Sequence, residues 1–166
     1  MMTVFPLAEM ETPNAIAIVF HLFAINLWIG GTVFIVLVLN HAAKGIDSSQ
    51  HHQLMQAVLS RFFTLVWIAM LVLLCSGSWM IYGMYDGLVN APLYIILMML
   101  LGLVMVSNFL LTYFGPYRHY RKVPRSDDSA DSRVYLAKIR LLSWVNVILG
   151  ACVLVIIGGG HHLMGS

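Results

Sequence analysis

The stretch NAIAIVFHLFAINLWIGGTVFIVLVL (Asn14–Leu39) decides the fold of this chain. It contains no charged residue and exceeds the roughly 20 residues that cross about 30 Å of hydrocarbon as a helix. Three later stretches share this character, and the predicted spans are residues 14–39, 62–82, 92–113 and 141–160. With short connections between them, these spans predict an all-α integral membrane protein, an up-down bundle of four transmembrane helices that forms one domain over residues 1–166.

The composition excludes a soluble protein. The chain is 60% hydrophobic and only 10% charged, whereas about a quarter of the residues of a soluble domain are charged. A soluble bundle would also need a polar face on each helix, and the four spans have none. We therefore expect a lipid bilayer as the surroundings and no nucleic-acid partner. All seven acidic residues lie outside the spans, which argues against a proton pump with buried carboxylates.

The basic residues predict the orientation of the chain. All nine Lys and Arg residues lie in or beside the connections that follow the first and third spans. The positive-inside rule places both connections in the cytoplasm and both termini on the outer, periplasmic side of a bacterial inner membrane. We interpret the basic run of residues 117–125 either as side chains that snorkel at a helix end or as a contact for anionic lipid or a partner.

His21 is the main functional candidate because it lies inside the first span. An unsatisfied imidazole in hydrocarbon costs several kcal/mol, so the ring needs a partner. Ionisable residues within membrane spans are by default candidates for function. The alternative is a structural side chain that is hydrogen-bonded to Asn108, Asn146 or a backbone carbonyl.

Four sulfur-containing residues lie at a similar depth to His21. Counting about 1.5 Å per residue places Cys75, Met98, Met99 and Cys152 in a layer some 10–12 Å below the outer surface. Haem iron takes a His ligand with His or Met opposite, and copper(I) favours His, Met and Cys together. The alternative is that these four sulfur residues are ordinary apolar packing.

Two further histidines follow the last span. His161 and His162 come directly after Gly158-Gly159-Gly160 at the outer end. The hypothesis is an outward metal-capture surface, and the alternative is a set of solvated polar residues. Since His161 would sit about 12 Å above His21, the two cannot share one haem. The residues that would join these histidines in metal capture are Met1, Met2, Met10 and Met164.

The string HLFAINLWIGG (His21–Gly31) resembles the first span of the copper-resistance D (CopD-like) membrane superfamily. That span carries a His, a Trp seven residues later (here Trp28) and a pair of glycines. The superfamily includes the HemJ-type protoporphyrinogen oxidases, and Gly77-Ser78-Trp79 and Trp144-Val145-Asn146 are similar to their motifs. The resemblance implies haem b with His21 as an axial ligand. Trp28 lies seven residues later on the same helix face, where it would pack on the macrocycle. The layer at equal depth offers Met98 or Met99 as candidates for the other face.

The chain departs from the HemJ type at two places. The start of the third span reads Pro92-Leu93-Tyr94-Ile95-Ile96, without the His-x-Lys of that type. Val147 stands where HemJ-type proteins have Glu. The resemblance therefore implies the scaffold and the haem-side histidine rather than the oxidase activity.

Three functional hypotheses follow. The first is a haem b membrane protein that transfers electrons or serves as an accessory redox subunit. The second is a copper transport or resistance protein, whose metal ligands come from His21, Cys75, Met99, Cys152 and the pair His161 and His162. The third is a cofactor-free structural subunit, with other membrane subunits or further copies of itself as partners.

Overall fold

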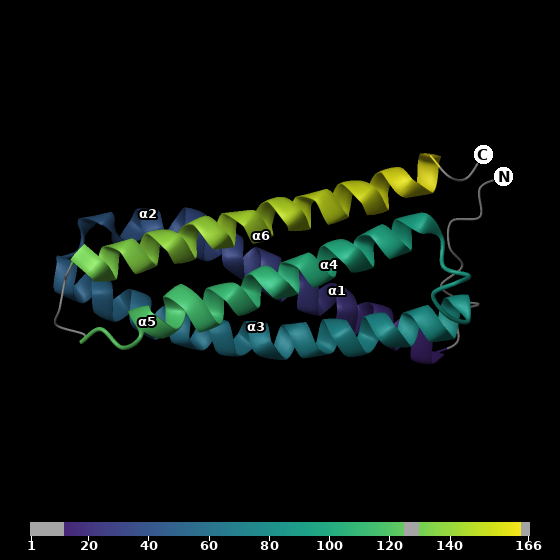
Figure 1. The fold of residues 1–166 in the computed structure, drawn as a ribbon, viewed down its shortest axis with the longest axis horizontal. Coiled ribbons are helices and arrows are strands. Elements are labelled where there is room, and N and C mark those ends of the chain that lie inside the picture. Colours follow the sequence, from purple (N-terminus) through teal and green to yellow (C-terminus); the bar gives the residue numbers. More distant parts are fainter. Residues whose placement is uncertain (1–11, 125–129, 164–166) are drawn as a thin grey trace.

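The computed structural model describes residues 12–124 and 130–163, and within these ranges every regular element is a helix. Figure 1 shows long helices running up and down side by side, with α1 beginning and α6 ending at the same end. The elements in chain order are α1 (Thr12–Val33), η1 (Phe34–Leu39), α2 (Asn40–Ala42), η2 (Ala43–Gly45), α3 (Ser48–Tyr85), α4 (Leu93–Thr112), η3 (Tyr113–Tyr117), α5 (Arg118–Tyr120) and α6 (Ala130–Leu163).

Four helical stretches are long and apolar enough to cross a membrane, which confirms the predicted four-span all-α class. Many large apolar side chains on them are exposed, as expected where lipid rather than water is the solvent. We call the end with α2, α5 and the start of α6 the basic end, because Arg118, Arg121, Lys122 and Arg133 lie there. The opposite end, where α1 begins and α6 ends, is called the terminal end. The stretches are Thr12–Ala42, Ser49–Tyr85, Leu93–Tyr120 and Asp131–Gly158.

The helices extend farther at the basic end than the predicted spans. The connection expected over residues 41–60 is mostly helix, since α3 already begins at Ser48. Hydropathy marks where hydrocarbon begins, but the helix continues as long as apolar residues recur at helical spacing. On α3, the buried residues Met55 and Leu59 lie before the predicted span and Phe63 lies inside it, each four residues from the next. Likewise α6 begins at Ala130, well before the predicted span at 141.

The connection between the third and fourth predicted spans, residues 114–140, begins as helix. After α4 the chain continues through η3 and α5 to Tyr120. Gly115 leaves the helical conformation (φ −86°, ψ −107°), and Pro116 follows it inside η3. Because proline has no backbone N–H to donate, it interrupts the regular helix. The interruption redirects α5 and the residues that follow it.

The bundle consists of two helix pairs, α1 against α3 and α4 against α6. Aromatic side chains join the pairs across their shared interior. Phe109 of α4 meets Trp28 of α1 and Trp67 of α3 edge-on, with ring centroids 5.7 and 5.5 Å apart. Phe63 of α3 lies 4.2 Å from Tyr117 of η3, centroid to centroid. These contacts fix the heights of the two pairs relative to each other.

Small residues allow close approach of the helices at selected positions. A Cβ on Gly31 would lie 2.8 Å from Cε2 of Phe62, and one on Gly150 would lie 2.7 Å from Cδ1 of Ile29. Both distances are shorter than carbon atoms tolerate, so a methyl group at either position would have to displace the facing side chain. A Cβ on Gly30 would meet open space.

Candidate functional site

The partner of His21 is Ser76 of α3. His21 Nδ1 lies 2.9 Å from Ser76 Oγ, and the Ser76 hydroxyl donates to the Val72 carbonyl at 2.6 Å. A hydroxyl has one proton, so Ser76 must accept from His21 and Nδ1 must carry the ring proton. This tautomer follows from the hydrogen-bond network. It leaves Nε2, with its lone pair, as the nitrogen available to a metal.

Two neighbours of Ser76 bring α1 close enough for this bond. A Cβ on Gly77 would lie 3.4 Å from Cε1 of His21, so the half-buried ring packs directly against the glycine. Farther toward the terminal end, Trp79 Nε1 donates to Asn14 Oδ1 at 3.3 Å. The first two membrane-spanning helices are therefore joined by two side-chain hydrogen bonds along one face.

The asparagines considered as partners of His21 bond each other instead. Asn108 Nδ2 donates to Asn146 Oδ1 and to the Leu142 carbonyl, both at 2.9 Å. This pair joins α4 to α6, and both side chains are buried. The sequence analysis did not identify Ser76 as the partner, because hydropathy does not show which helix face meets which.

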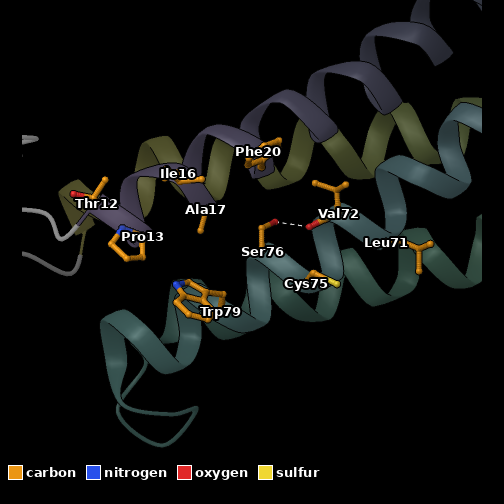
Figure 2. Close-up of a pocket in the computed structure, with 10 residues that line it drawn as sticks. All are labelled: Thr12, Pro13, Ile16, Ala17, Phe20, Leu71, Val72, Cys75, Ser76 and Trp79. Atoms are coloured by element: carbon orange, nitrogen blue, oxygen red, sulfur yellow. Dashed lines mark hydrogen bonds between the residues drawn. The ribbon is translucent and has the colours of Figure 1, made fainter.

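A groove of about 620 Å³ lies between α1 and α3, beside the His21–Ser76 hydrogen bond. Its walls are almost entirely apolar, and Figure 2 shows Ser76 and Trp79 directed toward α1. Cys75, an exposed free cysteine, lines the same groove. The lining residues are Thr12, Pro13, Ile16, Ala17 and Phe20 from α1, and Leu71, Val72, Cys75, Ser76 and Trp79 from α3.

The predicted layer of sulfur ligands is not assembled into one cluster. Within the described residues, no three His, Cys, Asp or Glu side chains form a group that could hold a metal ion, so His21, Cys75 and Cys152 do not form one site together. Equal depth sets only the height of a residue, whereas rotation about the helix axis sets its facing. Cys152 is exposed. Met98 is packed on the hydrophobic core and Met99 is half-buried.

Trp28, which the resemblance placed against a haem macrocycle, is covered by protein. Its side chain is 3% exposed and meets Phe109 edge-on. Because the ring already packs in the aromatic interior, it offers no free face to a porphyrin in this arrangement. The described arrangement around Trp28 therefore does not fit the expected haem contact.

The outer metal-capture residues cannot be placed. His161 and His162 belong to the last turns of α6, but their side chains lie outside the described part of the chain. Met1, Met2, Met10 and Met164 also lie outside the described residues. Their proposed role stays a prediction.

A second histidine forms a buried network at the basic end that the sequence analysis did not identify. His52 is 2% exposed. Its Nε2 accepts from Gln56 at 3.0 Å, and its Nδ1 donates to Ser132 Oγ at 2.9 Å. Gln56 also donates to the carbonyls of Tyr120 at 3.2 Å and Val123 at 2.9 Å. The network joins α3, α5 and α6, and the i, i+4 spacing of His52 and Gln56 was the one sequence signal for it.

Comparison with known proteins gives the family. Residues 56–159, more than half of the chain, match the family described as copper resistance protein D, CopD. The chain belongs to the CopD family. No curated protein matches the chain, and no solved structure matches it.

The family match confirms the predicted membership of the CopD-like superfamily. It covers most of α3, all of α4 and α5, and α6 as far as Gly159. The string His21–Gly31, which carried the resemblance, lies on α1 outside the matched range. The HemJ-type part of the resemblance stays a prediction, and membership of CopD favours the copper hypothesis over the haem hypothesis.

Proposed function

We propose that this multi-pass membrane protein handles copper, binding it within the membrane on the α1–α3 face. The observation that carries the proposal is the His21–Ser76 hydrogen bond, together with membership of the CopD family. Metal-bound histidines nearly always donate their second ring N–H to a fixed partner, which orients the ring and makes the ligating nitrogen more basic. Ser76 serves His21 in this way.

We assign His21 Nε2 as the nitrogen ligand and the Cys75 thiolate as the sulfur ligand. Cys75 precedes Ser76 on α3 and lines the groove beside it. A thiolate and an imidazole together suit copper(I), which prefers soft ligands. Met99 and Cys152 belong to the other helix pair, α4 and α6, whereas His21 and Cys75 belong to the pair α1 and α3. Copper is the cargo in this proposal and not a resident catalytic group.

We further propose that the basic end faces the cytoplasm of a bacterial cell and the terminal end faces outward. The positive-inside rule supports this orientation, because the described Lys and Arg residues gather at the basic end. His21 and the groove would then lie nearer the outer surface. Copper would reach them from that side, where His161 and His162 serve as capture residues.

Anaerobic competition with a chromophoric copper(I) chelator tests the proposal on the purified chain. We expect about one copper(I) ion per chain. Loss of a group that only hydrogen-bonds a metal ligand typically weakens metal affinity by about 10-fold or more, so His21→Ala, which removes the ligand itself, should weaken it by at least about 10-fold. His41→Ala is the matched control, because His41 is an exposed histidine on α2 at the basic end. It should bind copper like the wild type.

Three results would overturn the proposal. Full copper affinity in His21→Ala would remove the ligand assignment. A Soret band without stoichiometric copper would favour the haem b protein. A chain that holds neither copper nor haem and co-purifies with other membrane subunits would favour the structural-subunit hypothesis.

A further inference from the structure

A second cavity lies at the basic end, away from the groove between α1 and α3. Its volume is about 530 Å³, within the roughly 300–1,000 Å³ of small-molecule sites. Unlike the groove, it has a largely polar lining. The residues around it are Gln56 and Ser60 of α3 and the consecutive Arg121, Lys122, Val123 and Pro124 after α5.

The buried His52 network holds the far wall of this cavity in place. Gln56 donates to the Val123 carbonyl at 2.9 Å, which ties the segment after α5 to α3. The backbone N–H groups of Arg121 and Lys122 donate to the carbonyls of Tyr117 and His119 at 2.9 and 3.0 Å. The segment that carries the two cations is therefore ordered by hydrogen bonds.

The cavity is electropositive. Arg121 and Lys122 are exposed, and Arg61, also exposed, directly follows Ser60. Within residues 12–124 and 130–158, no carboxylate forms an ion pair with these three cations. Their charge is therefore available to an external anion. Guanidinium and ammonium groups beside a hydroxyl suit the oxygens of a phosphate, which accept charge-assisted hydrogen bonds.

The hydropathy of the sequence also places the cavity near the expected membrane surface. The third membrane-spanning stretch ends at Tyr120, one residue before Arg121. On α3, the uncharged apolar run begins at Phe62, two residues after Ser60. Lipid phosphates occupy this boundary between hydrocarbon and water. Each basic side chain near the surface contributes about 1 kcal/mol to the binding of anionic headgroups, which raises the binding affinity about fivefold.

We propose that this cavity binds the phosphate of an anionic membrane lipid, with Arg121 and Lys122 as the charged contacts and Ser60 as a hydroxyl donor. The proposal is independent of copper binding, because the cavity contains neither His21 nor any residue that lines the groove between α1 and α3. It goes beyond side chains that merely snorkel at a helix end, because α3 supplies an opposite wall.

Native mass spectrometry of the full chain, with phosphatidylglycerol and phosphatidylcholine of matched acyl chains, tests the site. We expect the wild type to retain phosphatidylglycerol preferentially, and Arg121→Gln/Lys122→Gln to lower that preference by about 10-fold or more. Arg133→Gln/Lys138→Gln is the matched control, since it removes two exposed cations from α6. The control variant should keep the preference for phosphatidylglycerol within about twofold of the wild type. An equal loss in both variants would show that positive charge in general attracts the anionic lipid, and would overturn the proposed site.

A second variant leaves both cations in place. Ser60→Glu puts a carboxylate on the α3 wall, and we expect it to abolish the preference for phosphatidylglycerol; an unchanged preference would overturn the site. Inorganic phosphate distinguishes the source of the anion. Millimolar phosphate that displaces the lipid completely would indicate a site for free phosphate and overturn the lipid assignment, whereas retention of the lipid supports it.

Discussion

His21 on α1 and Ser76 on α3 are joined by a 2.9 Å hydrogen bond between Nδ1 and Oγ. The Ser76 hydroxyl in turn donates to the Val72 carbonyl. This order of donor and acceptor places the ring proton of His21 on Nδ1 and leaves Nε2 for a ligand. The same bond satisfies a polar ring inside an apolar span, so the contact serves both the stability of the helix pair and the proposed copper site.

Replacing Ser76 tests its role as the positioning group for His21. In Ser76→Ala the ring loses the partner of Nδ1, and we expect the affinity for copper(I) to fall by about 10- to 100-fold. Chelator competition measures this change. Ser107→Ala is the control, because Ser107 bonds the carbonyl four residues earlier in the same way but belongs to α4. Equal losses in both serine variants would contradict the positioning role.

Gly30 and Gly31 form a matched pair for testing helix packing. Alanine at either position gains about 1 kcal/mol of helix propensity. At Gly31 the new methyl group would meet the Phe62 ring at 2.8 Å, whereas at Gly30 it meets open space. We expect Gly31→Ala to be less stable than Gly30→Ala by about 1–3 kcal/mol. Unfolding of both variants in detergent measures the difference, and equal stabilities would contradict the packing of α1 on α3.

The Asn108–Asn146 pair predicts an energetic coupling between α4 and α6. Hydrogen bonds between membrane helices contribute about 0.6 kcal/mol on average and up to about 1.7 kcal/mol. We expect a coupling energy in this range from a double-mutant cycle with Asn108→Ala and Asn146→Ala. The free energies of unfolding of the two single variants and the double variant give the coupling. Strictly additive effects would show that the 2.9 Å contact contributes nothing.

His52 should stabilise the basic end without affecting copper. His52→Ala removes the two buried hydrogen bonds to Gln56 and Ser132, and a hydrogen bond contributes about 0.5–1.5 kcal/mol to stability. We expect faster amide hydrogen exchange over residues 117–123 and unchanged affinity for copper(I). His51→Ala is the control, because the adjacent His51 is not buried. Identical exchange in both variants would contradict the role of the network.

The sequence predicted the central residue of the candidate site but not the partner of that residue. The polarity of His21 inside an apolar span marked it as a residue that needs a partner. The partner itself was not predictable, because serine is small and nearly neutral in hydropathy and Ser76 resembled its packing neighbours. Among the described residues His21, Cys75 and Cys152 do not form one cluster, since the two cysteines are exposed on different helix pairs, and the roles of Met98 and Met99 stay predictions.

The sequence alone determined the four spans, the all-α class and the gathering of positive charge at one end. Each of these follows from the cost of placing charge or unpaired backbone in hydrocarbon, which depends on composition along the chain. Only the tertiary structure decided which faces meet. The rotation of each helix, fixed by contacts such as Gly31 with Phe62 and Trp28 with Phe109, paired His21 with Ser76 and turned Cys152 outward. Such rotation depends on side-chain packing between helices distant in the chain, so it becomes visible only when they are assembled.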